Sequence, residues 1–175
     1  MITKDNNLKV MELLFKFPFR IFHIRELSRL TGLSSTGIIK IVKRLKKEKL
    51  LITSKTKHVE EIRPDFNGKF LLIKRLYNIY SLYDSGLIDL IKKYYEMPQA
   101  IILFGSYSDG KDTEKSDIDI AVITYKKTLP DLKKFENKLS RKISVYIINL
   151  DKAEKEFKNS LANGIVLEGF MEMIK

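Results

Sequence analysis

The stretch of sequence that decides the fold of this chain is residues 99–123, QAIILFGSYSDGKDTEKSDIDIAVI. Its first six residues are mostly apolar, as in a buried strand, and they lead directly into Gly105 and Ser106. After ten intervening residues, Asp117 and Asp119 open a second apolar run. A Gly-Ser pair and an Asp-x-Asp pair at this spacing, each beside a predicted strand, are the strongest signal in the chain.

The two aspartates are predicted to lie on one face of the second strand. Successive strand side chains alternate between faces, so Asp117 and Asp119 point the same way while the isoleucines next to them enter the core. Paired carboxylates suit Mg²⁺, which takes its other ligands from water and substrate phosphates. Gly105 allows close approach of the backbone to a phosphate, and Ser106 offers its hydroxyl and amide at the start of the next turn. The competing interpretation is a pair of solvent-facing acids beside an ordinary turn.

At these residues the sequence resembles the minimal nucleotidyltransferases of the polymerase-beta-like superfamily, over roughly residues 98–170. The resemblance implies that Gly105 and Ser106 bind nucleotide phosphates. It also implies that Asp117 and Asp119 are the metal-binding and catalytic carboxylates. The cofactor would be Mg²⁺ or Mn²⁺, with ATP or another nucleoside triphosphate (NTP) as substrate or ligand.

The family's third carboxylate, which comes from a later strand, is missing at the expected position. That strand is predicted over residues 143–148, and Ser144 stands where the acid is expected. A serine is a poor replacement for an anionic ligand or base, and nearby Tyr146 carries no carboxylate. Glu136 or Asp151 could contribute only with suitable geometry. The sequence therefore supports metal and nucleotide binding more strongly than turnover.

The N-terminal part is predicted to begin with three helices. Apolar residues at helical spacing predict a first helix over residues 7–17 and a short second helix over 24–30. Gly32 provides a tight turn that accepts positive φ, and Ser34 or Ser35 caps the third helix. The core-facing side of the third helix is formed by Ile38, Ile41, Val42 and Leu45.

Two β-prone runs, residues 50–53 and 58–62, then predict a hairpin with basic residues at its tip. This order resembles the winged helix-turn-helix domains of prokaryotic transcription regulators, over roughly residues 5–66. Double-stranded DNA would be the partner, although such domains also dock proteins. The predicted DNA contacts are Ser35, Thr36, Lys40, Lys43 and Lys47 in the third helix, and Lys55 and Lys57 in the hairpin.

The distribution of charge differs between the N-terminal and C-terminal parts of the chain. The chain has a formal net charge of +11. Residues 1–66 hold 15 basic and 7 acidic residues, a net of +8, whereas residues 99–175 hold 13 and 12, a net of +1. A basic N-terminal part suggests contact with a polyanion.

The chain has no cysteine and no apolar run near the roughly 20 residues of a membrane span. We therefore expect a soluble, cytoplasmic protein.

The predicted fold class is α+β, with a helical connector between the two domains. The aromatic and apolar residues of the connector predict two helices, with a break near Ser85 and Gly86. These helices are expected to form part of the core or a homodimer interface. The C-terminal domain is expected to be a small mixed sheet flanked by helices. The predicted domains are residues 1–66, 67–97 and 98–175.

Two functions from different classes remain open. In the first, the protein is an enzyme that transfers a nucleoside monophosphate to a hydroxyl of a protein or small molecule. By resemblance to stand-alone domains that act as antitoxins, its partner would be a helical toxin-like protein, and the DNA-binding domain would regulate its own operon. In the second, it is a transcription regulator whose degenerate domain senses nucleotide without catalysis. A purely structural role for the C-terminal domain ranks last.

Overall fold

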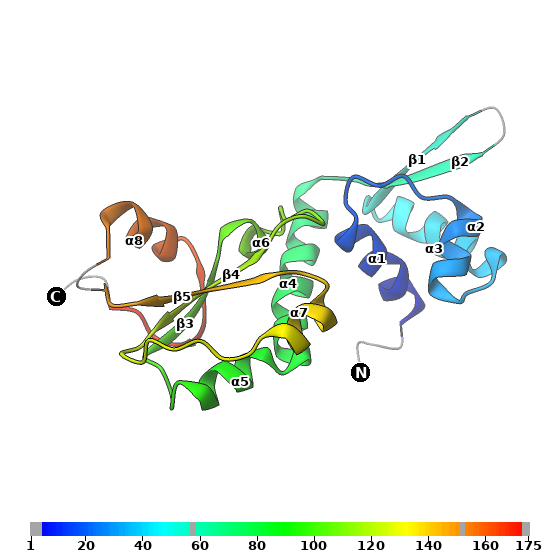
Figure 1. Cartoon of the computed structure of the whole chain (residues 1–175). Coiled ribbons are helices and arrows are strands. Elements are labelled where there is room, and N and C mark those ends of the chain that lie inside the picture. Colours follow the sequence, from blue (N-terminus) through cyan, green and yellow to red (C-terminus); the bar gives the residue numbers. More distant parts are fainter. Residues whose placement is uncertain (1–4, 57–58, 151–152, 173–175) are drawn as a thin grey trace. The chain divides into compact units, whose positions relative to one another are not determined.

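The computed structural model describes residues 5–56, 59–150 and 153–172 (Figure 1). The chain divides into two compact units, Met1–Lys74 and Arg75–Lys175. None of the described helices is both long enough and apolar enough to cross a membrane.

The first unit consists of helices followed by a two-stranded antiparallel sheet. In chain order its elements are α1 (Asn6–Lys16), α2 (Ile24–Thr31), α3 (Ser35–Lys47), β1 (Leu51–Lys55) and β2 (Glu60–Pro64), and α4 (Gly68–Ser85) begins in this unit and ends in the second.

Local sequence explains how α2 gives way to α3. Gly32 ends α2 in the left-handed region, with φ of 72°. The Ser34 hydroxyl accepts a hydrogen bond from the Gly37 amide at 3.1 Å, so Ser34 is the cap among the two serines predicted for this role. Three of the four predicted core residues of α3 are buried, and Ile41 is half-buried.

One prediction about this unit needs correction, namely the position of Lys55 at the tip of the hairpin. Lys55 lies within β1 and not in the turn. The antiparallel pairing of β1 with β2 extends as far as Lys55 and Glu60, whose opposite charges favour their cross-strand contact.

The second unit is built around a four-stranded mixed sheet. After α4 its elements are α5 (Leu87–Tyr94), β3 (Ala100–Phe104), α6 (Gly105–Asp109), β4 (Ile118–Ile123), α7 (Lys133–Leu139), β5 (Ile143–Ile148), α8 (Lys155–Ala162) and β6 (Ile165–Gly169). The strand order is β5-β4-β3-β6. Strand β3 pairs antiparallel with β4 and β6, and β4 pairs parallel with β5. The predicted strand over residues 143–148 is therefore confirmed as β5.

The sheet separates two apolar clusters, because alternate residues of each strand face opposite sides. On one face, β3 and β4 residues such as Ile101 and Ile118 pack with Leu87 and Ile91 of α5. The predicted connector helix α5 is thus part of this core. On the other face, the remaining residues of β3 and β4 pack with Leu161 of α8.

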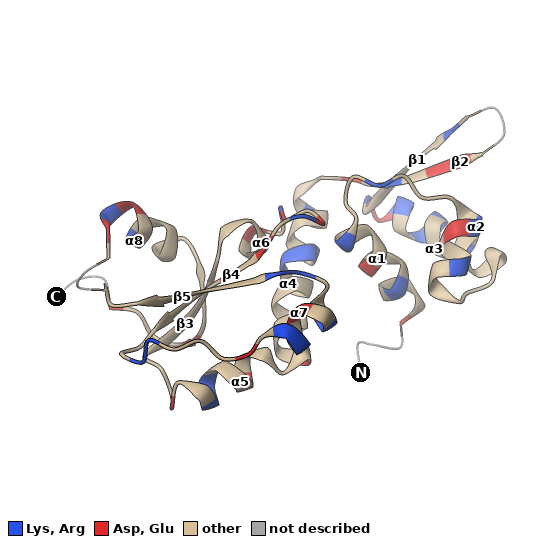
Figure 2. Ribbon diagram, viewed as in Figure 1, with Lys and Arg blue, Asp and Glu red and all other residues tan. Residues whose placement is uncertain are grey.

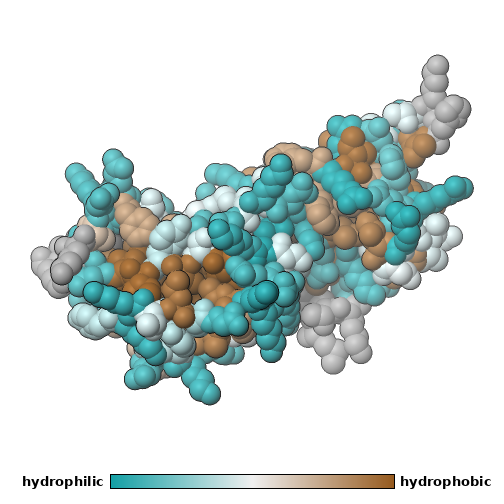
Figure 3. Space-filling model, viewed as in Figure 1, coloured by the Kyte–Doolittle hydropathy of each residue, from teal (hydrophilic) through white to brown (hydrophobic). Residues whose placement is uncertain are grey.

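Strands β5 and β6 form the two edges of the sheet. Hydrophobic side chains gather at the surface over the area where Figure 1 draws β5 (Figure 3). The β5 residues are largely half-buried, with fully buried side chains only at its two ends, Ile143 and Ile148. This edge strand therefore presents its middle residues to solvent beside β4.

Candidate functional site

The two predicted metal-binding aspartates lie at the start of β4, on the face of the sheet that also packs against α8. Asp117 directly precedes the strand and Asp119 is its second residue. Both are half-buried, whereas Ile118 and Ile120 have no exposed surface. The alternation expected from the sequence is therefore present, and both carboxylates face away from the core that contains α5.

The Gly-Ser pair follows the neighbouring strand and lies against these acids. Phe104, the last residue of β3, is the register partner of Asp119. Gly105 then turns the chain with φ of +73°, and a Cβ built on it would lie 2.6 Å from Asp119 Oδ2. Ser106 follows in the first turn of α6 and is half-buried. The fold thus brings the two halves of the motif together.

The third strand of the site is β5, and it places Ser144 where a third carboxylate was expected. Ser144 is the register partner of Asp119 across the parallel ladder. Its hydroxyl donates a hydrogen bond to Asp117 Oδ2 at 3.2 Å. Glu136 is engaged elsewhere, since it accepts a hydrogen bond from the Ile143 amide at 3.0 Å, and Asp151 lies outside the described residues. Among the described residues, β5 thus contributes a hydroxyl and no carboxylate at the position opposite Asp119.

Tyr146 is a member of the site that the sequence did not point to as a functional residue. Its hydroxyl donates to Asp119 Oδ1 at 3.5 Å. The ring packs against Phe104 and Phe157, with centroid distances of 5.4 and 5.9 Å. Residues i and i+2 of a strand share a face, so the position of Tyr146 two residues after Ser144 was the available signal.

The electrostatics of the site favour binding of a cation. Burial, together with the negative charge of Asp117, raises the pKa of Asp119, and the Tyr146 hydrogen bond only partly opposes this. Burial and the charge of Asp119 also raise the pKa of Tyr146. A divalent cation would relieve the repulsion between the carboxylates.

The donor set fits a metal ion that arrives with its substrate. In the described part of the chain, no group of three or more His, Cys, Asp or Glu side chains could hold a metal ion. Mg²⁺ is commonly bound by only one or two carboxylates and completes its shell with water and substrate phosphates. Asp117 and Asp119 match that pattern.

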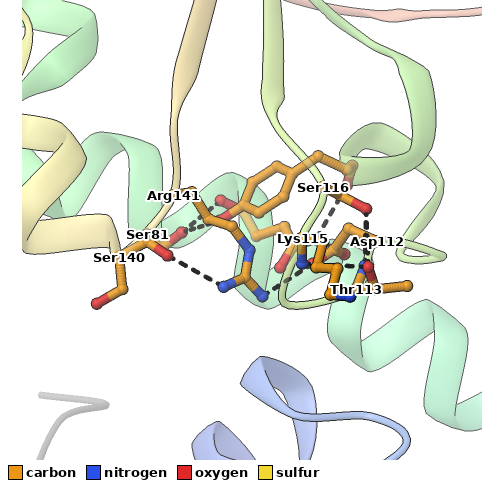
Figure 4. Close-up of polar contacts among 9 residues, drawn as sticks. Ser81, Asp112, Thr113, Lys115, Ser116, Ser140 and Arg141 are labelled. Atoms are coloured by element: carbon orange, nitrogen blue, oxygen red, sulfur yellow. Dashed lines mark hydrogen bonds and ion pairs between the residues drawn. The ribbon is translucent and has the colours of Figure 1, made fainter.

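A buried polar network braces the loop between α6 and β4 (Figure 4). Asn78 of α4 donates to the Tyr107 carbonyl at 2.9 Å and to Asp112 Oδ1 at 2.8 Å. Arg141 approaches Asp112 at 3.7 Å, with both side chains almost fully buried. Burial raises the pKa of Tyr107 to about 12, so its hydroxyl stays protonated. The network holds Tyr107 and Asp112, which lie at the start and in the middle of the segment that joins the Gly-Ser turn to the aspartates.

One cavity of the second unit lies away from these residues. A cavity of about 590 Å³ is lined by the far ends of β4 and β5, including Ile123 and Ile148, and by the segment that contains Tyr125. No residue predicted from the sequence to bind metal, nucleotide or DNA lines it.

The predicted DNA contacts in α3 form one exposed face of the first unit. Figure 2 shows basic residues on α3 and in the hairpin. The exposed residues are Ser35, Thr36, Lys40, Lys43 and Lys47 in α3, with Lys55 in β1. Lys40, Lys43 and Lys47 recur at helical spacing, whereas Lys57 lies outside the described residues.

Comparison with known proteins places the second unit in a family. Residues 86–169 match the family model described as polymerase beta, nucleotidyltransferase. The chain is also similar to a chain in a crystal structure of a toxin-antitoxin with AMP-PNP. That similarity has 30 % sequence identity over 48 % of this chain and 71 % of that chain, with a TM-score of 0.39. No curated protein matches the chain. Residues 86–169 therefore form a domain of the polymerase beta nucleotidyltransferase family.

Proposed function

We propose that the second unit binds an NTP with a divalent metal ion and transfers the nucleoside monophosphate to a hydroxyl of a protein or small molecule. The observation that carries this proposal is the approach of Gly105 to Asp119, where a Cβ would lie 2.6 Å from Oδ2. The phosphate-binding and metal-binding halves of the motif thereby form one site. The family membership of residues 86–169 supports the same reaction class.

In this proposal, Asp117 and Asp119 hold Mg²⁺ or Mn²⁺, and Gly105 and Ser106 bind the phosphates of ATP or another NTP. A bound divalent ion would neutralise phosphate charge and polarise the reacting phosphate. The protein's contribution is position: the Gly-Ser turn holds the phosphates beside the carboxylates, and an acceptor hydroxyl attacks the α-phosphorus in line with the departing pyrophosphate. No covalent protein nucleophile is needed.

A nucleotide-sensing regulator without catalysis is the second candidate. Ser144 favours it, because the hydroxyl that bonds Asp117 at 3.2 Å carries no charge and is a poor base. The two candidates share nucleotide binding and differ only in product formation.

Titration calorimetry with ATP and other NTPs, with and without Mg²⁺, tests the shared step. Intact-mass spectrometry of the same mixtures tests the transfer. Binding together with nucleotidylated product supports the enzyme, and binding without product supports the sensor. Absence of magnesium-dependent binding would contradict both candidates.

Gly105→Ala should weaken magnesium-dependent nucleotide binding by at least about tenfold. A side chain in the left-handed region costs about 1–2 kcal/mol, and the new Cβ would also collide with Asp119 Oδ2. Calorimetry measures the affinity, and circular dichroism verifies the fold. Gly68→Ala is the matched control, because nothing lies within 4 Å of its Cβ position and its φ is not positive. Unchanged affinity in Gly105→Ala would show that close approach at Gly105 is not needed.

We propose that the first unit is a winged helix that binds double-stranded DNA. The supporting observations are the element order α1-α2-α3-β1-β2, the cap at Ser34 and the exposed basic face of α3. Lysines on that face would contact phosphates, and Ser35 and Thr36 at its N-terminal end would reach base edges.

Replacing Lys40 and Lys43 with Ala should weaken DNA binding and reduce the slope of log affinity against log salt by about 2, since each phosphate contact contributes about one counterion. Fluorescence anisotropy over a salt series measures this. The control Lys9→Ala/Lys16→Ala removes the same charge from α1 and should change the slope less. Equal effects of the two double variants would favour a general charge effect, and no salt dependence in the parent protein would favour protein docking.

The family resemblance also suggests a protein partner for the second unit. We propose that a helical toxin-like protein carries the acceptor hydroxyl and that the first unit regulates the operon encoding both. Co-expression with proteins encoded nearby, followed by mass spectrometry, tests the acceptor. We also propose a homodimer, which sedimentation analysis tests.

A further inference from the structure

Tyr146 carries an exposed hydroxyl beside one of the proposed metal ligands. Its oxygen lies 3.5 Å from Asp119 Oδ1, and the residue has an exposed fraction of 42 %. Ser144 also carries a hydroxyl at the site, but that residue is half-buried and its hydroxyl bonds to Asp117. Tyr146 therefore combines proximity to the carboxylates with access from solvent.

The strand order places the backbone of Tyr146 on the other side of β4 from the phosphate-binding turn, and its ring reaches over the sheet toward Phe104. Gly105 and Ser106 follow β3, the aspartates are on β4, and Tyr146 is on β5, the strand on the other side of β4. In-line transfer requires the attacking oxygen and the leaving pyrophosphate on opposite sides of the α-phosphorus. With phosphates held over the Gly-Ser turn, the attacking hydroxyl approaches from beyond the carboxylates, and the Tyr146 hydroxyl lies beside Asp119 on β4.

The tyrosine ring is held firmly by aromatic packing. It is tilted by 62° against Phe104 and by 49° against Phe157, and those two rings meet each other at 90°. Tilted and edge-to-face contacts of this kind are favourable. The hydroxyl is therefore positioned beside Asp119 before any substrate binds, which lowers the entropic cost of attack.

We propose that the protein nucleotidylates its own Tyr146. This inference rests on the proposed transferase function and names an acceptor for it within the chain. The Tyr146 oxygen forms a bond to the α-phosphorus of the NTP, the bond from that phosphorus to the bridging oxygen breaks, and pyrophosphate leaves. The phenol proton passes to Asp119 Oδ1, which already accepts its hydrogen bond, and then to solvent. The product is a phosphodiester between Tyr146 and the nucleoside.

Such an adduct would occupy the acceptor side of the site. The modified protein should therefore transfer less nucleotide to any external acceptor than the unmodified protein. Self-modification would thereby limit the activity when no partner fills the acceptor position.

The test uses the full-length protein incubated with Mg²⁺ and ATP. Intact-mass spectrometry should show a gain of one nucleoside monophosphate, and peptide mapping should place it on Tyr146. Tyr146→Phe keeps the ring packing and removes the nucleophile, so the adduct should fall to background. Tyr125→Phe, at a tyrosine with an exposed fraction of 94 %, should leave it unchanged. An adduct on another residue, or an equal adduct in Tyr146→Phe, would overturn the proposal.

A second experiment, protection of Tyr146 from chemical modification, does not depend on nucleotide transfer. Nitration of Tyr146 by tetranitromethane should slow in the presence of Mg²⁺ and α,β-methylene ATP, whose α,β bridge cannot be cleaved by transfer, while nitration of Tyr125 should not. If calorimetry shows binding of this analogue but Tyr146 is not protected, the nucleotide lies elsewhere and the inference fails, although nucleotide binding stands. If no nucleotide binds, the proposed function fails and the inference fails with it.

Discussion

Replacing Asp117 and Asp119 together with Asn should reduce magnesium-dependent nucleotide affinity by more than about 100-fold. Changing only a partner of a metal ligand typically costs about 10- to 100-fold in metal affinity, and this double variant removes both proposed ligands. The amides keep the size of the side chains and can still bond Ser144 and Tyr146. Titration calorimetry with and without Mg²⁺ measures the loss.

The fold of this variant should survive, because the carboxylates repel each other in the absence of a cation. Asp119 has a raised pKa, caused first by burial and second by the charge of Asp117. Because Asp119 binds its proton more tightly in the folded state than in the unfolded state, it stabilises the folded protein at low pH. This stabilisation is lost as the pH rises from 3.8, the ordinary pKa of the group, through the raised pKa. Asp119→Asn should remove this part of the pH dependence, and thermal unfolding from pH 3 to 8 measures it.

Asp89 and Asp131, both exposed, provide the charge-matched control. The variant Asp89→Asn/Asp131→Asn should bind nucleotide as the parent protein does. If the Asp117→Asn/Asp119→Asn protein also keeps its affinity, the metal assignment is wrong. If both double variants lose affinity equally, net charge and not coordination explains the effect.

Ser144→Asp should increase metal affinity by about tenfold or more, and it should raise nucleotide transfer if the missing acid limits turnover. Affinity for hard cations depends on the number of charged oxygen ligands. Ser144 is the register partner of Asp119 and already lies within hydrogen-bonding distance of Asp117. An aspartate there would add a third carboxylate at the same edge of the sheet.

The added acid should also lower the stability of the metal-free protein through like-charge repulsion. Addition of Mg²⁺ should therefore raise the melting temperature of Ser144→Asp more than that of the parent. Ser144→Asn, which has the same shape as aspartate without its charge, is the control and should show neither effect. Equal magnesium responses in the Asp and Asn variants would mean that residue 144 does not face the ion. Higher affinity without transfer would support the sensor.

The part of the site that depends on local patterns could be predicted from the sequence. Alternation along a strand depends only on neighbouring residues, so the shared face of Asp117 and Asp119 was predictable and is present. The strand at residues 143–148 and the position of Ser144 followed from the apolar run and the family pattern, and β5 has those bounds. The turn at Gly32 and the cap at Ser34 were likewise readable from short-range chemistry.

The tertiary structure alone decided which strands are neighbours and in what register. The parallel pairing of β4 with β5 brings Tyr146 to Asp119 across 27 residues of chain, and no local pattern specifies that contact. The same holds for the buried bond from Asn78 to Asp112 across 34 residues. Lys55 was placed in the hairpin turn because an alternating pattern does not show how far two strands pair, and the ladder extends to Lys55 and Glu60. Amino-acid sequence determines local conformation directly, whereas contacts between distant segments depend on how the whole set of apolar faces packs.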